Sequence, residues 1–439
     1  MQRNMSMIRA KSVQCRYAST LSEASKHRIL VIGGGSGGLS VAHQIYNRFK
    51  AAGKSLSAGD IAIVDGTKNH DYQPGWTLVG SGLLPKSDFR RPLATLIPEY
   101  IEPISENVKS FSPATSTITT ESGRNLGYDA LVIATGLEIK WNAIQGLPAA
   151  LLDPKSGVSS IYSYDTCDKV WDDIENLKEG QAVFTQPAGI IKCAGAPQKI
   201  MWMAWDRYRK TNRLGNISVG FYTGMPTMFS VKKYSDALNA LRVQRDVGGH
   251  FSHNLESIDV ANRTANFKVP DGSVVQVGYS LLHVTPPMGP LNVIATSPVA
   301  DKAGWVEVDQ GTLQHVKYQN IFALGDCSSL PTSKTAAAIT AQAPVLTENL
   351  FSVMESGDVA AAIYDGYTSC PLLTGYGELL LAEFKYGLEP KESFEKFVDQ
   401  AKSHRVFYHL KKDLFPWAYW NFMVKGKWFG RSGIRRPVF

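Results

Sequence analysis

Apolar residues along the chain form short runs that alternate with longer segments of helical spacing, which is typical of an α/β protein. The first run, residues 28–32 (RILVI), leads into a glycine-rich turn, residues 33–38 (GGGSGG), and an amphipathic stretch follows from 39 to 50. A second apolar run, residues 61–64, ends at Asp65. This order predicts a strand, a tight turn, a helix and a second, parallel strand.

The glycine-rich turn has the spacing of a dinucleotide-binding fingerprint. Gly33, Gly35 and Gly38 occupy its three positions, which allow a tight turn, close approach of a pyrophosphate and close helix–strand packing. The pyrophosphate would lie on the helix N-terminus, and Asp65 would accept a hydrogen bond from a ribose hydroxyl. Residues 51–59 lengthen the loop before that acid. The predicted cofactor-binding turn comprises Gly33, Gly34, Gly35, Ser36, Gly37 and Gly38.

Two later apolar runs end in small or acidic residues that suit the same cofactor. One covers residues 128–136 and the other residues 320–326, and an apolar helix is expected from 334 to 354. The residues at the two strand ends are Thr135, Gly136, Gly325 and Asp326. The glycine turn, the Ala-Thr-Gly strand and the late Gly-Asp strand, in this order, resemble the two-dinucleotide-binding-domain flavoproteins. The resemblance implies FAD as the cofactor, with Asp326 on its ribityl chain.

The same resemblance implies that the segment from about 141 to 283 is a second, inserted Rossmann-like domain. In NAD(P)H-using members of that superfamily, a second glycine fingerprint follows the first strand of this domain. Its strand at 181–185 is followed by 186–197 (QPAGIIKCAGAP), where Gly189 and Gly195 are separated by bulky side chains. Such a loop prevents a pyrophosphate from approaching the backbone. We therefore predict that NAD(P)H is not the electron donor.

A cysteine stands where that second fingerprint would have glycines. Cys193 precedes a helix that we expect to begin at Ala196 and Pro197, since proline is favoured in a first helical turn. A thiol at a helix N-terminus near Lys192 and Lys199 has a lowered pKa. This position favours a reactive nucleophile over a buried structural cysteine, and both readings stay open at this point.

Five segments carry a more specific pattern. They are residues 193–201 (CAGAPQKIM), 72–80 (YQPGWTLVG), 282–288 (LHVTPPM), 325–338 (GDC, then LPTSKTAAA) and 364–372 (YDGYTSCPL). Together they resemble the sulfide:quinone oxidoreductases of the mitochondrial type. The resemblance extends from about residue 28 to the C-terminus, and the two cysteine segments are specific to this family.

This resemblance implies that Cys193 and Cys370 form a redox pair beside the flavin. Hydrosulfide would attack a bridge between them, either a disulfide or one with an inserted sulfur. Cys370 would keep the sulfur as a persulfide, and Cys193 would be the thiolate that passes electrons to FAD and on to ubiquinone. A small acceptor (glutathione, coenzyme A, sulfite or cyanide) would remove the sulfur. No third cysteine lies between Gly136 and Asp165, which favours a two-cysteine mechanism.

Further FAD contacts are implied by the resemblance alone. Asp65 stands where family members often have glutamate, and the shorter carboxylate can still accept from a ribose hydroxyl. Lys334 lies at an expected helix start, where a cation is unfavourable unless an anion such as reduced flavin lies nearby. The implied contacts are Ser36, Gly37, Asp65, Gln73, Val108, Asp326 and Lys334.

The remaining candidate residues favour structural interpretations. Cys327 is expected to pack near the cofactor, and Cys167 to be inert because neighbouring acids raise its pKa. His283 is expected to be a packed, hydrogen-bonded histidine. No Cys-x-x-Cys spacing occurs, which argues against a structural zinc site.

The N-terminal 22 residues read as a mitochondrial transit peptide. They carry four basic residues and no acid, although a disordered basic tail has the same composition. Without those four charges the net charge of +7 falls to +3. Nothing in this balance indicates a nucleic-acid partner.

The last 36 residues, 404–439, combine eight Lys or Arg, one acid and ten aromatic residues. Apolar positions recur near helical spacing, Pro416 is expected to interrupt the helix, and the segment is too short to cross a bilayer. We expect this segment to lie in the surface of the mitochondrial inner membrane and to make the protein a peripheral (monotopic) membrane protein. The alternative is a helix pair packed on the core or on a second subunit, so a homo-oligomer stays open.

These observations predict an α/β protein with two Rossmann-like domains. The expected division is a transit peptide (1–22), a discontinuous FAD domain (23–140 and 285–365), an inserted domain (141–284) and a C-terminal region (366–439). Two other functions stay open besides sulfide oxidation. One is a type II NADH:quinone dehydrogenase, and the other is a non-catalytic redox-sensing flavoprotein.

Overall fold

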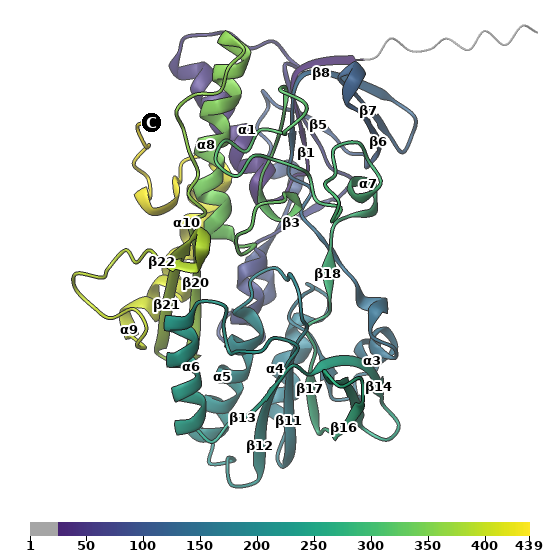
Figure 1. The fold of residues 1–439 in the computed structure, drawn as a ribbon, viewed down its shortest axis with the longest axis vertical. Helices are drawn as coiled ribbons and strands as arrows, with labels where there is room; N and C mark the ends of the chain where they lie inside the picture. Colours follow the sequence, from purple (N-terminus) through teal and green to yellow (C-terminus); the bar gives the residue numbers. More distant parts are fainter. Residues whose placement is uncertain (1–24) are drawn as a thin grey trace, which may run out of the picture.

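The computed structural model describes residues 25–439 and arranges them as two α/β halves, one above the other in Figure 1. The predicted transit peptide lies outside the described residues. In the upper half, four parallel strands lie side by side in the order β2-β1-β8-β19. They are β2 (Ile61–Val64), β1 (Ser25–Ile32), β8 (Asn125–Ile133) and β19 (Ile321–Ala323).

Three shorter strands complete this upper sheet. β5 (Glu102–Ile104) joins β2 in parallel, while β6 (Val108–Ser112) and β7 (Thr117–Thr120) add an antiparallel pair to β8. All four residues of β2 are buried, because a parallel sheet is covered on both faces. Helices α1 (Ser36–Ala51) and α8 (Ala336–Ser356) pack against each other beside the sheet.

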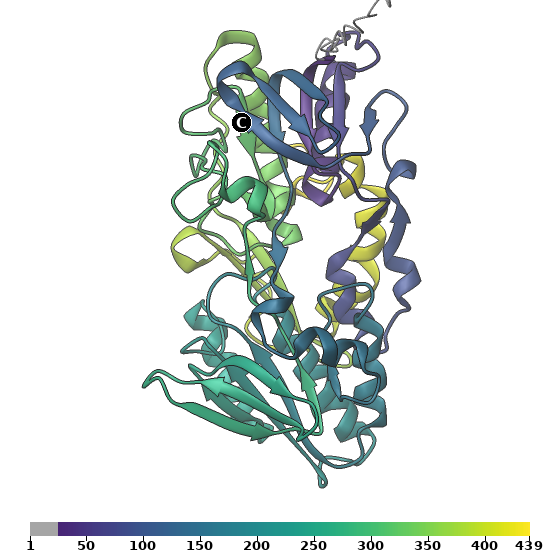
Figure 2. The ribbon, with the colours of Figure 1, turned by 90° about the vertical axis from the view of Figure 1, so that its right-hand side faces the viewer.

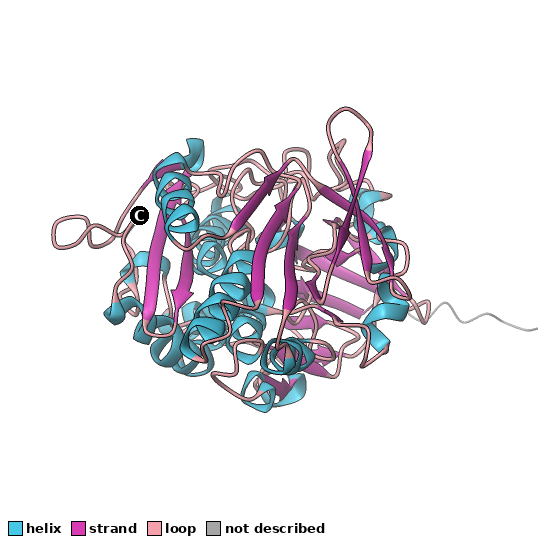
Figure 3. Cartoon of the chain, turned by 90° about the horizontal axis from the view of Figure 1, so that it is seen from below, coloured by secondary structure: helices cyan, strands magenta, loops and turns pink. Residues whose placement is uncertain are grey.

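The lower half contains a fully parallel five-stranded sheet, seen from below in Figure 3. Its order is β10 (Val158–Ser159), β17 (Leu281–His283), β11 (Gly180–Gln186), β12 (Ile217–Thr223) and β13 (Gly248–Phe251). The helices that accompany it are α4 (Cys167–Asn176), α5 (Ala196–Lys210) and α6 (Lys232–Gln244). α5 begins where the sequence predicted.

A small antiparallel sheet covers the other side of the lower half. It consists of β14 (Asn254–Asp259), β15 (Thr264–Lys268) and β16 (Val274–Gly278). Phe267 from β15 shares a core with Val183 and Tyr222 of the parallel sheet. The two sheets therefore enclose a second hydrophobic core.

Two chain crossings join the halves. β9 (Glu138–Ile139) leaves the upper half and pairs antiparallel with β18 (Met288–Gly289), which returns to it. The lower half is thus inserted between β8 and β19, as predicted, and the α/β architecture with two parallel sheets is confirmed. Short elements in the connections are β3 (Asn69–Asp71), β4 (Arg90–Pro92), α2 (Trp76–Val79), α3 (Leu147–Leu152) and α7 (Asn292–Ala295).

The C-terminal region begins with an antiparallel sheet. Its strands are β20 (Thr368–Gly375), β21 (Glu378–Lys385) and β22 (Glu389–Pro390). A helical stretch follows: α9 (Arg405–His409), a π-helical turn (Leu410–Leu414) and α10 (Phe415–Asn421). Figure 2 shows it in yellow beside the segment that contains α2.

The prediction that Pro416 interrupts this helix was wrong. Helical backbone continues through His409, Leu410, Leu414 and Phe415, and the wide π turn lies directly before the proline. A π turn changes the i→i−4 pattern that a proline ring would otherwise obstruct. Among residues 25–439 no helix has the length and apolar character needed to cross a bilayer.

Candidate functional site: a glycine-rich cofactor turn and a pair of buried thiols

The glycine turn between β1 and α1 is shaped for a ligand. Gly33 has φ +103°, and a Cβ there would lie 2.5 Å from the carbonyl oxygen of Ala134. A Cβ on Gly38 would lie 1.8 Å from the carbonyl oxygen of Gly33. By contrast, no described atom lies within 4 Å of the Cβ position at Gly35. This open space above the N-terminus of α1 is where a pyrophosphate would approach the backbone.

The second-strand acid lies against this turn. One Asp65 oxygen accepts a hydrogen bond from the Gly34 amide at 2.5 Å, and the other accepts from Thr67. Gly66, next to Asp65, packs against Asn107, which places Val108 at the start of β6 beside the same strand end.

The strand ends of β8 and β19 supply further polar groups. Thr135 and Gly136 follow β8 directly, and the buried Thr135 hydroxyl has no hydrogen-bond partner among the described residues. Gly325 and Asp326 follow β19 in a short helical turn. An unpartnered hydroxyl facing the carboxyl ends of parallel strands indicates a ligand with polar groups.

Lys334 lies just before α8, with Thr335 as the N-cap. Its ammonium group donates to the carbonyl of Ser328 and stands 4.3 Å from the Trp305 ring centre. Burial lowers the pKa of Lys334, and Asp326 partly offsets this shift. Burial likewise raises the pKa of Asp326, against the influence of its lysine neighbours. Each of the two charges therefore partly offsets the effect of burial on the pKa of the other group.

The loop that carries Cys193 is tied to the upper half. The Cys193 amide donates to the carbonyl of Lys334 at 2.8 Å, and Lys192 donates to the side-chain oxygen of Gln73 at 2.7 Å. Cys193 itself adopts φ +54°, a left-handed conformation that is rare for a residue with a side chain. Such conformations are concentrated at functional sites. The loop thus presents its thiol at the boundary between the halves.

Cys370 reaches the same place from β20. The two sulfur atoms lie 3.8 Å apart, although the residues belong to distant parts of the chain. A Cβ on Gly195 would lie 2.5 Å from the Cys370 sulfur and 2.3 Å from the Leu372 side chain. The missing side chain of Gly195 therefore makes room for β20 to bring its cysteine to Cys193.

The pair is asymmetric in charge. The sulfur–sulfur contact with Cys370 is the largest cause lowering the pKa of Cys193, and the ammonium of Lys199 adds to it. The Lys199 nitrogen lies 3.2 Å from the Cys193 sulfur. The same sulfur–sulfur contact raises the pKa of Cys370 well above its ordinary value. These shifts favour the thiolate form at Cys193 and the thiol form at Cys370.

A second lysine near the thiols was not predicted from the sequence. Lys411 comes from the π turn between α9 and α10, is almost fully buried and donates to the carbonyl of Pro74 at 2.7 Å. Burial lowers the pKa of Lys411 to about 7, and the repulsion of Lys199 acts in the same direction. Its position in a basic terminal segment gave no sign that it points inward.

The other candidate residues behave as structural groups. His283 is fully buried, accepts a hydrogen bond from the Ile161 amide and has its pKa lowered by burial to about 3. Cys327 is buried, and burial raises its pKa. Burial also raises the pKa of Cys167 to about 12, with Asp168 as a smaller cause. The sequence analysis attributed that shift to the neighbouring acids, whereas desolvation is larger.

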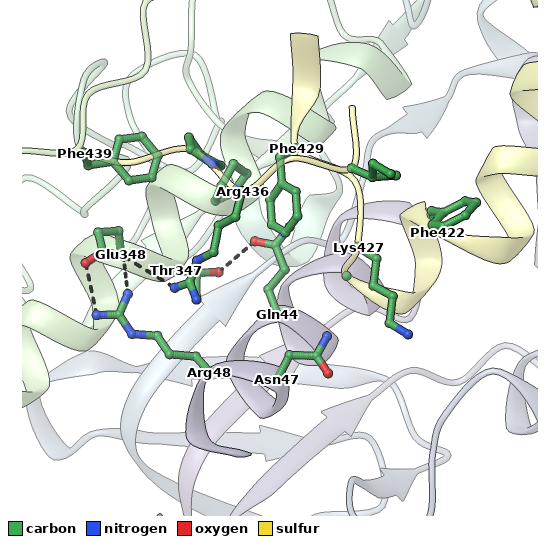
Figure 4. A pocket seen from close by; sticks show the side chains of 14 residues that line it. Gln44, Asn47, Arg48, Thr347, Glu348, Phe422, Lys427, Phe429, Arg436 and Phe439 are labelled. Carbon is green, nitrogen blue, oxygen red and sulfur yellow. Dashed lines mark hydrogen bonds and ion pairs between the residues drawn. The ribbon is translucent and has the colours of Figure 1, made fainter. Parts of the chain in front are cut away.

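The C-terminal segment covers α1 and also leaves an open cavity. Phe407, Tyr419, Trp420 and Met423 are buried against the body of the protein. A cavity of about 380 Å³ lies between α1, α8 and the tail (Figure 4). Its lining includes Arg48, Glu348, Phe422, Lys427, Phe429, Arg436 and Phe439.

Comparison with known proteins places the chain in a family. Residues 27–179 match the model for the pyridine nucleotide-disulphide oxidoreductase family. The chain is 51% identical to the mitochondrial sulfide:quinone oxidoreductase of Schizosaccharomyces pombe, over 98% of this chain and 96% of that protein. It is 41% identical to the mouse mitochondrial sulfide:quinone oxidoreductase, over 97% and 93%.

A solved structure agrees at the level of the fold. The sulfide:quinone oxidoreductase from the bacterium Aquifex aeolicus superposes with a TM-score of 0.74 at 19% sequence identity, covering 91% of this chain and 92% of that one. At such low identity the likeness concerns the arrangement of the two halves. Full-length identity to the two eukaryotic relatives is the stronger finding, and it shows that the chain belongs to the mitochondrial sulfide:quinone oxidoreductase family.

Proposed function

We propose that this protein oxidises hydrogen sulfide to sulfane sulfur and transfers the electrons through FAD to ubiquinone. The observation that carries the proposal is the Cys193–Cys370 pair, with its sulfur atoms 3.8 Å apart. Lys199 lies beside the pair, and the Cys193 amide donates a hydrogen bond to the carbonyl of Lys334, just before α8. The relatives with 51% and 41% identity carry the sulfide:quinone oxidoreductase name.

The residues around the glycine turn fit FAD. The open space at Gly35 suits a pyrophosphate, and the unpartnered Thr135 hydroxyl and the buried Asp326 suit polar groups of a cofactor. When bound, FAD would accept two electrons from the cysteine pair and deliver them to a quinone. The residues proposed to hold it are Gly33–Gly38, Asp65, Gln73, Val108, Thr135, Gly136, Gly325, Asp326 and Lys334.

The sulfur chemistry follows from the asymmetry of the thiols. Hydrosulfide attacks the Cys370 sulfur of the bridge, which forms an S–S bond in a Cys370 persulfide and releases Cys193 as a thiolate. Lys199 stabilises that leaving thiolate from 3.2 Å. An acceptor thiolate or sulfite then takes the outer sulfur and leaves the Cys370 thiol. Loss of two electrons and one proton from the pair remakes the bridge.

Stopped-flow absorbance of the flavin under anaerobic conditions tests this proposal. Sulfide together with sulfite as the acceptor should bleach the flavin of the FAD-loaded protein, and a short-chain quinone should restore its colour. Cys193→Ser and Cys370→Ser should each abolish sulfide-dependent bleaching, whereas Cys167→Ser should leave it intact. Bleaching by NADH without any response to sulfide would replace the proposal with NADH:quinone oxidoreduction, and bleaching by neither would leave a redox-sensing flavoprotein.

We also propose that residues 404–439 hold the protein on the mitochondrial inner membrane, where a quinone resides. The outward side of the C-terminal helix exposes Val406 (61%), Leu414 (39%) and Trp417 (54%). Lys427 and Arg436 line the nearby cavity, and basic and aromatic groups together suit an anionic lipid surface (Figure 4). The buried face of the same segment supports its packing on the core at the same time.

A further inference from the structure

A buried network of hydrogen-bonded polar groups connects the C-terminal helix to the glycine turn. The Tyr419 hydroxyl, from α10, lies 2.7 Å from the Ser36 hydroxyl and 2.6 Å from Nε2 of His70. Nδ1 of His70 lies 2.8 Å from the carbonyl oxygen of Gly34. Both ends of this hydrogen-bonded network therefore lie on the turn that would bind a pyrophosphate.

The direction of these hydrogen bonds follows from the groups themselves. Burial lowers the pKa of His70, and burial raises the pKa of Tyr419, so both are neutral. A carbonyl only accepts, so Nδ1 of His70 carries the hydrogen and Nε2 accepts from the Tyr419 hydroxyl. The Tyr419 oxygen is then left to accept from Ser36, and this contact fixes the position of the Ser36 side chain.

The contact continues along one face of α1. Ser40 donates to the carbonyl of Met423 at 3.0 Å, and Asn47 donates to the carbonyl of Lys425 at 3.3 Å. Gly426, with φ +64°, approaches so closely that a Cβ there would lie 2.6 Å from the Gln44 amide nitrogen. Residues 36, 40, 44 and 47 share one side of a helix, so the tail follows α1 from its N-terminus onward.

We propose that Tyr419 and His70 complete the phosphate-binding turn, so that the C-terminal helix holds Ser36 in place for the pyrophosphate of FAD. The inference rests on the proposed FAD site and goes beyond it, because it makes a segment far outside the fingerprint part of that site. Binding free energies are reciprocal, so FAD should in turn tighten the docking of residues 415–426 on α1.

Reconstitution of the full-length apoprotein with FAD tests the inference. Tyr419→Phe removes one oxygen and keeps the ring, whose centre lies 4.3 Å from that of Tyr72. Loss of a buried hydrogen-bonded hydroxyl should raise the dissociation constant of FAD about fivefold to tenfold, measured by quenching of flavin fluorescence. Tyr408→Phe is the matched control, because the Tyr408 hydroxyl forms no hydrogen bond with the described part of the chain.

Two further readouts separate this role from a general loss of stability. Hydrogen exchange should show that FAD protects the amides of residues 415–426 in the native sequence and protects them less in Tyr419→Phe. Ser36→Ala and Tyr419→Phe should also be non-additive in a double-mutant cycle. Equal FAD affinity and equal protection in Tyr419→Phe would overturn the inference while leaving FAD binding intact. Failure of the native apoprotein to bind FAD would overturn the proposed function as well.

Discussion

At the residue scale, Gly195 is the position that allows the two sulfur atoms to meet. The side chains of Cys370 and Leu372 fill the volume that a Cβ at this position would occupy. A methyl group there must push β20 away from the Cys193 loop, because both neighbours belong to a buried strand. At this position the absence of a side chain matters more than the conformational freedom of glycine.

We predict that Gly195→Ala separates the thiols. Overpacking of this kind costs about 1–3 kcal/mol of unfolding free energy, measurable as a lower Tm. Sulfide-dependent bleaching of the flavin should slow by at least roughly tenfold, because a barrier higher by about 1.4 kcal/mol gives that factor. Gly215→Ala is the control, since no described atom lies within 4 Å of its Cβ position. Native bleaching rates in Gly195→Ala would refute the steric argument.

Lys199 sets the reactivity of Cys193 through charge. Its ammonium favours the thiolate, so the rate of Cys193 alkylation in the reduced protein should reach its plateau at a lower pH than for an ordinary cysteine. In Lys199→Met the midpoint of this pH profile should move upward by about one pH unit, since one unit corresponds to about 1.4 kcal/mol. Iodoacetamide labelling followed by peptide mass spectrometry measures it. Lys210 is exposed on the same helix, so Lys210→Met should leave the midpoint of the alkylation profile unchanged.

Local sequence predicted Cys193 and Lys199 because both belong to one helix start. Lys411 and Gly195 could not be understood in this way. Lys411 is basic in a basic tail, and its inward direction depends on a π turn that precedes Pro416. Gly195 looked like a remnant of a fingerprint, because the strand that needs its space follows much later in the chain.

At the element scale, the helical stretch 405–421 has two faces with different partners. One face is buried against α1 and the thiol site through Tyr419 and Lys411, and the other exposes Val406 and Trp417. The buried face agrees with the expected alternative of packing on the core, and the exposed face is the one that we propose for the membrane surface. Its π turn is what aims Lys411 inward while the helix axis continues.

We predict that Val406→Ser combined with Trp417→Ser weakens binding to vesicles that contain anionic phospholipid. The dissociation constant should rise by about tenfold, because about 1.4 kcal/mol of interfacial burial is lost. Vesicle co-sedimentation measures the change, and Tm should stay within about 2 °C because both side chains are exposed. Phe397→Ser, an 82% exposed site outside the segment, is the control. Unchanged vesicle binding in the double variant would show that this face does not contact lipid.

At the scale of the whole molecule, alternation of apolar runs predicted an α/β protein, and the resemblance to two-dinucleotide-binding-domain flavoproteins added the second sheet and its insertion. The apolar second half of β1 and the whole of β2 can be recognised in the sequence because burial on both faces of the sheet leaves no polar positions there. The antiparallel sheet β14–β16 was not predicted, and packing of the tail on the core was left open without α1 as the partner. Both depend on contacts between distant segments, which no local pattern encodes.

The central claim is that sulfide enters through a bridge between Cys193 and Cys370. Peptide mass spectrometry without reduction, on protein oxidised by quinone and then treated with one equivalent of sulfide without an acceptor, tests it most directly. The account predicts a linked peptide pair containing Cys193 and Cys370 before sulfide. After sulfide it predicts an extra sulfur on Cys370 with Cys193 free. A linkage to Cys167 or Cys327, or no linkage between Cys193 and Cys370 in the oxidised protein, would contradict it.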